Sequence, residues 1–97
     1  MRRYWVYMVL CGDGSYYVGI INNVELRVAQ HNDGLDPHCY TFLRRPVSLV
    51  YTAEFDQPNK AIAWEKHLKG WSRGKKEALV ASNWAELKRL SHWHESN

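Results

Sequence analysis

Cysteine, long apolar segments and repeated sequence are scarce or absent in this chain of 97 residues. The two cysteines, Cys11 and Cys39, have no zinc-type spacing and are too few for a disulfide framework. We expect free thiols in a reducing compartment, with a Cys11–Cys39 disulfide as the alternative. No apolar run is long enough to cross a bilayer, and the N-terminus has no signal-peptide core. The expectation is a soluble, cytoplasmic protein.

The composition is that of a globular chain, with 45% hydrophobic and 24% charged residues. Its length predicts a single domain over residues 1–97, with a core from about residue 4 to residue 90 and a frayed tail over residues 92–97. The net charge of +3 permits a nucleic-acid partner without requiring one.

Lysine and arginine are unevenly distributed, with a pair at Arg44 and Arg45 and a dense run between residues 60 and 76. Such a run is typical of a solvated helix face, and it also suits contact with nucleic-acid phosphates. Under the second interpretation the candidate contacts are Arg44, Arg45, Lys69, Arg73, Lys75 and Lys76.

Apolar patterning and turn residues predict the element order ββαβααα, an α+β domain in which a small sheet packs against helices. Strands are expected over residues 4–10, 16–21 and 47–55, and both faces of the sheet are apolar, so both should be covered. Helices are expected to end near residues 32, 69, 81 and 91. Their expected caps are Asn22 or Asn23, Asp56, Ser72 and Asn83.

The turn at residues 12–14 decides which side chains share a face. A two-residue turn at Asp13-Gly14 would put Tyr7 and Tyr17 on opposite faces. A three-residue loop with a left-handed Gly14 would shift the register by one and bring Tyr7, Tyr17 and Gly19 to one face. Hydrophobicity does not choose between the two registers, because both faces are apolar in either.

Ionisable side chains fall at two places where the expected helices should be apolar. Arg27 and His31 lie beside the apolar stripe of the first helix, either at its rim or facing an anion. Glu65 lies near the centre of an apolar arc on the second helix, where a carboxylate needs a partner. That partner is either a structural Arg or Lys or a divalent cation. Trp64, Trp71 and Trp84 are expected to pack, although aromatics beside basic residues can also stack bases.

Several motifs together resemble the GIY-YIG nuclease superfamily, most closely its small stand-alone bacterial members. Its two triplets correspond to Trp5-Val6-Tyr7 and Tyr17-Val18-Gly19. The stretch NNVELRVAQHN carries Arg27 and His31 at the family's Arg and His positions, and RRPVSLVY matches the third strand. In AIAWEKHLKGWSRGKKEALV, Glu65 matches the metal-binding Glu, and Asn83 falls where many members carry a late Asn. The match covers about residues 4–90.

The resemblance implies a three-stranded antiparallel sheet flanked by helices, and the three-residue hairpin loop, because the family's geometry needs Tyr7 and Tyr17 together. It implies phosphodiester cleavage with one divalent cation, Mg²⁺ or Mn²⁺, held by Glu65 and water. In the implied mechanism Tyr17 is the general base, and Tyr7 relays a proton or positions water. Arg27 binds the phosphate, and His31 transfers a proton or contacts the phosphate. Gly19 lets the substrate approach closely, and Asn83 supports the site.

The function expected from this resemblance is that of a metal-dependent endonuclease acting on DNA, in branched, damaged or single-stranded form, with a role in repair or recombination, as a monomer or weak dimer. The alternatives are a nucleic-acid-binding module with weak activity and a structural or protein-interaction domain. Ile20 and Ile21 stand where many members carry Lys or a hydroxyl residue. The loop over residues 34–41 has Asp36 and Pro37 instead of lysines, so substrate preference is less defined than the metal centre.

Overall fold

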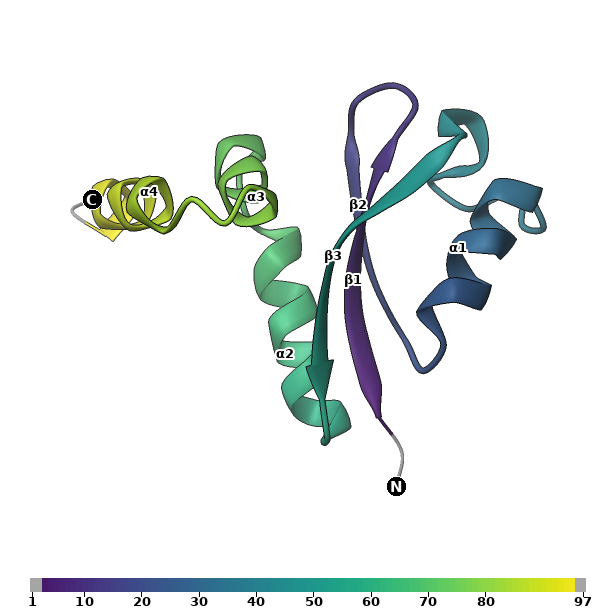
Figure 1. Cartoon of the computed structure of the whole chain (residues 1–97), viewed down its shortest axis with the longest axis horizontal. Helices are drawn as coiled ribbons and strands as arrows, with labels where there is room; N and C mark the ends of the chain where they lie inside the picture. Colours follow the sequence, from purple (N-terminus) through teal and green to yellow (C-terminus); the bar gives the residue numbers. More distant parts are fainter. Residues whose placement is uncertain (1–2, 96–97) are drawn as a thin grey trace.

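The computed structural model describes the backbone of residues 3–95 and the side chains of residues 3–90. Within this range β1 (Tyr4–Cys11), β2 (Tyr16–Ile21) and β3 (Val47–Phe55) form one antiparallel sheet in the order β2-β1-β3. The helices are α1 (Val24–Asp33), α2 (Pro58–Lys69), α3 (Arg73–Val80), α4 (Trp84–Glu95) and the short 3₁₀ helix η1 (Phe42–Arg44). The expected order ββαβααα is confirmed (Figure 1).

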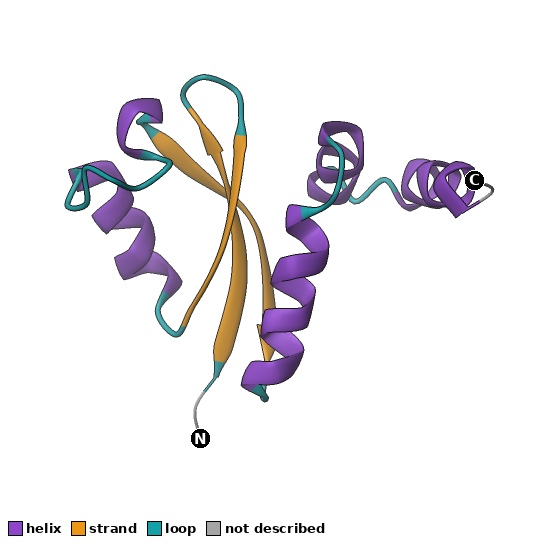
Figure 2. Cartoon of the chain, turned by 180° about the vertical axis from the view of Figure 1, so that it is seen from behind, coloured by secondary structure: helices purple, strands orange, loops and turns teal. Residues whose placement is uncertain are grey.

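The two faces of the sheet are covered by different helices (Figure 2). Successive side chains of a strand point to opposite faces, so Val6 and Met8 join the core on the α2 side, while Tyr7 and Val9 lie under α1. All four are buried to 1% exposure or less. Burial on both faces explains why β1 is apolar at every position rather than at alternate ones.

The β1–β2 hairpin adopts the three-residue loop. Gly14 has φ of 86°, the left-handed conformation that glycine tolerates, and its N–H donates to the Cys11 carbonyl at 2.9 Å. In the resulting register Val9 pairs with Tyr17 and Tyr7 with Gly19. Tyr7 and Tyr17 therefore share the α1 face, whereas Tyr16 packs against the core on the α2 side.

Side-chain caps fix most of the helix starts. Asn23, Ser72 and Asn83 each accept a hydrogen bond from a backbone N–H in the first turn of α1, α3 and α4. The expected cap at Asp56 is wrong. Pro58 occupies the first position of α2, which moves the cap to Gln57, whose side chain makes no capping bond.

The C-terminal helices extend from the end of α2 away from the sheet (Figure 1). The expected end of the last helix near residue 91 is wrong, because α4 continues to Glu95. The frayed tail expected over residues 92–97 stays a prediction, and its residues 96–97 lie outside the described part. Trp84 does not pack as expected, because it is 65% exposed. Among the described helices none combines the length and apolarity needed to cross a membrane.

Candidate active site

Gly19 on β2 makes room for the ring of Tyr7 on β1. The two residues are direct partners in the sheet. A Cβ atom at position 19 would lie 2.5 Å from the Tyr7 hydroxyl oxygen and 2.6 Å from Cζ. Only glycine therefore lets the Tyr7 ring cross β2 at this point. The structure gives Gly19 a packing reason that is independent of substrate approach.

His31 of α1 is buried, with 4% exposure, and both of its ring nitrogens have partners. Nε2 lies 3.0 Å from the Tyr7 hydroxyl, and Nδ1 lies 2.6 Å from Oγ1 of Thr41. The Thr41 hydroxyl donates to Cys39 Sγ at 3.4 Å, so its oxygen is left to accept from Nδ1–H. Nε2 is then the acceptor, and Tyr7 donates to it. The direction of this chain makes His31 a proton acceptor for Tyr7.

Arg27 supplies positive charge beside the two tyrosines. Burial raises the pKa of Tyr7 to about 12, and it also raises the pKa of Tyr17; in both cases the Arg27 charge opposes the rise. Burial and then the Arg27 charge lower the pKa of His31. At neutral pH the cluster therefore holds two neutral phenols, a neutral imidazole and one guanidinium. A phenolate at Tyr17 requires further positive charge nearby.

Sequence reasoning missed the loop residues that complete the cluster. Tyr40 stacks on Tyr17, with ring centroids 5.9 Å apart and an interplanar angle of 21°. The Arg44 guanidinium lies 3.9 Å from the Tyr40 ring centroid and pairs with Asp13 at 3.0 Å. Thr41, 1% exposed, is the second missed residue. No periodicity marks these positions, because the path of the loop rather than a repeating element brings them to the site.

Glu65 lies on the face of α2 that meets the sheet, between Ala61 and Leu68, which are fully buried. Its side chain is 16% exposed and pairs with Lys69 at 3.7 Å, so the structural partner anticipated from the sequence is present. Burial is the main cause of the raised pKa of Tyr17, and the negative charge of Glu65 adds to it.

The donor set around Glu65 is suited to a hard divalent cation. Within residues 3–90 no three His, Cys, Asp or Glu side chains come together to hold a metal ion, which disfavours a four-ligand zinc centre. Mg²⁺ needs one or two carboxylates and takes its other oxygens from water and substrate phosphate. A single partly exposed carboxylate fits that requirement.

The other candidate residues lie outside the cluster or at its margin. Asn83 is exposed and caps α4, where its Oδ1 accepts from the Glu86 N–H at 3.2 Å, so the structure does not bring it to the tyrosines. Arg73 reaches the Gly14 carbonyl and pairs with Glu77 at 2.8 Å. Among the remaining basic candidates, the Arg45 guanidinium lies over the Phe42 ring and the Lys75 ammonium over the Trp71 ring. Lys76 is half-buried on α3.

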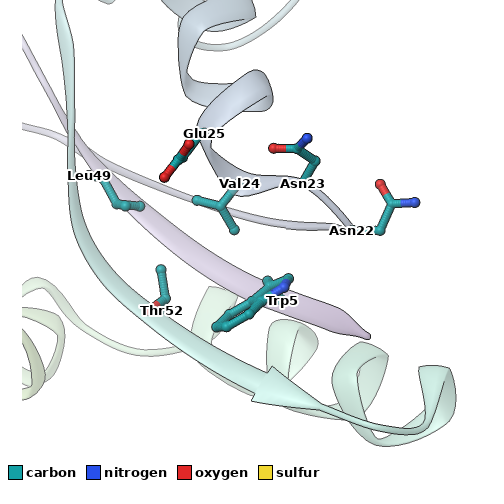
Figure 3. Close-up of a pocket in the computed structure, with 7 residues that line it drawn as sticks. All are labelled: Trp5, Asn22, Asn23, Val24, Glu25, Leu49 and Thr52. Carbon is teal, nitrogen blue, oxygen red and sulfur yellow. The ribbon is translucent and has the colours of Figure 1, made fainter. Parts of the chain in front are cut away.

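A separate hollow of about 350 Å³ lies under the first turn of α1 (Figure 3). Its lining residues are Trp5, Asn22, Asn23, Val24, Glu25, Leu49 and Thr52. None of them belongs to the tyrosine cluster, and the one charged group among them is a carboxylate. This hollow is therefore unsuited to a phosphate, and the cluster on the other side of α1 is the stronger candidate site.

Comparison with known proteins agrees with this geometry. Residues 3–78 match the family described as the GIY-YIG catalytic domain. A UPF0213 protein from Staphylococcus saprophyticus is 41% identical over 81 residues, which cover 84% of this chain and 98% of that protein. A UPF0213 protein from Halobacterium salinarum is 46% identical over 74 residues, which cover 76% of this chain and 95% of that protein.

Two related solution NMR structures share the fold. A UPF0213 protein from Bacillus halodurans is 39% identical with a TM-score of 0.54, over 81% of this chain and 83% of that one. A protein from E. faecalis is 33% identical with a TM-score of 0.59, over 84% and 86%. The sheet, the paired tyrosines and the Arg–His helix define a nuclease-type domain. The chain belongs to the GIY-YIG family.

Proposed function

We propose that this protein is a nuclease that hydrolyses phosphodiester bonds in DNA with one divalent cation, Mg²⁺ or Mn²⁺. The observation that carries the proposal is the convergence of Tyr7, Tyr17, Arg27 and His31 at one point, with the Glu65 carboxylate within electrostatic reach. Four of these five residues come from segments that precede residue 32, and the fifth comes from α2 on the opposite face of the sheet. A purely structural role gives no reason for this set to meet.

The roles follow from charge and proton position. Hydrolysis requires removal of a proton from water and stabilisation of charge that develops on the phosphate. Arg27 is the permanent cation of the cluster and binds the non-bridging phosphate oxygens. Tyr17 loses its own proton to Tyr7, which passes its proton to Nε2 of His31, and Arg27 favours the resulting Tyr17 phenolate. The phenolate then accepts the proton of the attacking water as the P–O bond to the leaving oxygen breaks, and the leaving oxygen takes up a proton from solvent.

The cation supplies positive charge that stabilises the developing negative charge and adds to the Arg27 effect on the phenols. Glu65 is the residue that would hold it, with Lys69 displaced from its ion pair. The alternative is a binding module that retains the fold without useful turnover. The raised pKa of Tyr17 favours this binding module, because a neutral phenol is a poor base.

Incubation of the protein with single-stranded, duplex and branched DNA, and with RNA, in Mg²⁺ or Mn²⁺ tests the proposal. Arg27→Ala and Glu65→Gln should each lower cleavage by about 10²-fold or more. Glu77→Gln is the matched control, because Glu77 is also the acidic member of an i,i+4 ion pair on a helix but lies outside the cluster. Salt-sensitive binding without cleavage of any substrate would establish the binding module instead. The substrate that is cut fastest would assign a role in repair or recombination.

A further inference from the structure

The outer side of α2 carries two neighbouring hollows that the tyrosine cluster does not use. One, of about 590 Å³, is lined by Lys66, His67, Gly70, Trp71, Ser72, Lys75 and Leu90. The other, of about 490 Å³, is lined by Phe55, Lys60, Ala63, Trp64 and His67. His67 borders both, so the two hollows lie side by side along α2, and we call them together the α2 groove.

The α2 groove is positively charged. Its lining contains Lys60, Lys66 and Lys75 and no acidic residue. None of these three lysines forms an ion pair among the described side chains, whereas Arg44, Lys69 and Arg73 elsewhere are paired. The groove therefore presents unneutralised cations, which favours a ligand that carries several negative charges.

Aromatic rings alternate with these cations along the groove. Trp64 stacks on His67 with centroids 5.5 Å apart, and His67 meets Trp71 edge to face at 5.5 Å. Lys75 Nζ lies 4.5 Å from the Trp71 ring centroid. The Trp64 indole is held in orientation by its bond to the Tyr51 hydroxyl at 3.2 Å, while His67 is exposed. His67 is thus an exposed ring that is stacked on Trp64 and in edge contact with Trp71, so the three rings form one aromatic cluster that solvent reaches at His67.

A short basic path joins the groove to Glu65. Lys69 pairs with Glu65 at 3.7 Å and is half exposed. Lys66 is one helical turn before Lys69 on the same side of α2, and it lines the groove. A polyanion bound near Glu65 would meet these two lysines in turn as it passes round the C-terminal end of α2.

We propose that the α2 groove binds single-stranded nucleic acid flanking the bond that is cut, an inference that rests on the proposed function. Phosphates pair with Lys66 and Lys75, and a base stacks on the exposed aromatic cluster at His67. Aromatic stacking favours a single strand, because the bases of a duplex are already stacked on one another. Lysines alone would suit a duplex equally well, so the exposed aromatic ring is what decides the class of ligand.

Fluorescence anisotropy of a labelled 12-mer oligothymidylate in EDTA, measured over a range of salt concentrations, tests this site without cleavage. The double variant Lys66→Glu/Lys75→Glu should bind at least tenfold more weakly. The slope of log affinity against log salt should become shallower by about 1.4, because each of the two lost phosphate contacts with a single strand contributes about 0.7. Glu at the third position of α3 is a favourable capping residue behind Ser72, so the fold should persist.

His67→Ala should weaken binding by about 5- to 150-fold, the equivalent of one stacked base, and leave the salt slope unchanged. Lys88→Glu is the control for reversing a single charge outside the groove, since Lys88 is exposed on α4 and does not line the groove; its binding should equal that of the wild type. Oligouridylate should show the same dependence on the groove, and any difference in affinity reports a contact with the sugar or with the thymine methyl group.

The proposal is overturned if the wild type binds no single strand, or if the double variant binds as the wild type does. Duplex bound as tightly as single strand, with no effect of His67→Ala, also overturns it. Competition by polyglutamate as effective as that by oligonucleotide would show a site for an acidic protein. Cleavage that depends on Glu65, together with normal binding by the groove variants, would contradict the groove proposal but not the proposed nuclease activity. Groove-dependent binding without cleavage would contradict only the proposed nuclease activity.

Discussion

The Tyr7 hydroxyl on β1 lies 3.0 Å from Nε2 of His31 on α1, in the layer where α1 covers the sheet. Both residues are buried, with exposures of 1% and 4%. The bond joins the two elements that carry the family's most recognisable residues. It is at once a packing contact and the first step of the proposed proton path, so its removal should affect stability and activity together.

Tyr7→Phe removes the hydroxyl and leaves Nε2 of the buried His31 without a partner. The free energy of unfolding should fall by about 1–3 kcal/mol, the cost of an unsatisfied buried polar group. Cleavage should fall by about 10²–10⁴-fold if Tyr7 takes part in proton transfer. Urea denaturation and single-turnover cleavage measure the two effects. Unchanged cleavage in a folded variant would remove Tyr7 from the mechanism.

Gly19→Ala places a methyl group 2.5 Å from the Tyr7 hydroxyl oxygen, so the ring must move. We expect a loss of about 1–3 kcal/mol in the free energy of unfolding, typical of overpacking, together with lower activity. Gly74→Ala is the matched control, because its nearest neighbour, Leu90 Cδ1, would lie at an ordinary 3.8 Å. In helix α3 it should raise stability by about 0.5–1 kcal/mol. Thermal unfolding of both variants checks the contrast, and a Gly19→Ala protein as stable as the wild type would contradict the close packing.

The lowered pKa of His31 makes stability depend on pH. The unfolded protein binds a proton at His31 below about pH 6.5, whereas the folded protein resists it until a lower pH, because burial disfavours the charged ring. The free energy of unfolding should therefore fall as the pH drops below about 6.5, by up to about 1.4 kcal/mol per unit for this one group. Denaturant titrations between pH 5 and pH 8, a range of about one and a half units on either side of that value, measure the slope.

His31→Gln should flatten this slope even if the variant is less stable overall. His38→Gln is the control and should keep the slope of the wild type, because His38 lies exposed in the loop after α1. An equal slope in all three proteins would show that His31 is not the group responsible.

Glu65→Gln separates metal binding from stability. Its ion pair with Lys69 is half exposed on the lysine side, so the pair contributes little to folding, and the free energy of unfolding should change by less than about 1 kcal/mol. Binding of Mn²⁺, followed by calorimetry or by the electron paramagnetic resonance of the free ion, should be lost. Glu77→Gln, which removes a comparable pair on α3, should retain Mn²⁺ binding. Normal Mn²⁺ binding by Glu65→Gln would place the cation elsewhere.

Much of the architecture could be predicted because local chemistry decides it. β3 begins and ends where its β-branched and aromatic run does, and Gly34, with φ of 67°, ends α1 as its position after Asn32-Asp33 indicates. The cap of α2 was misplaced by one residue, because Pro58 acts from inside the helix. The exposure of Trp84 was missed because aromatic content alone does not say whether a partner surface lies opposite.

The sequence by itself determined the order of elements, because turn chemistry, helix caps and hydrophobic period act over a few neighbours. The residues of the candidate site were predicted from the resemblance to a family. The sequence left the hairpin register open, since both faces of the sheet are apolar, and only the resemblance to a family selected it. The tertiary structure decided what could not be read locally. The loop after α1 brings Tyr40 and Thr41 onto Tyr17 and His31, and Gly19 is required by the ring of Tyr7 on another strand. These contacts join residues distant in the chain, and only the packing of α1 and the loop that follows it on the β1–β2 hairpin brings them together.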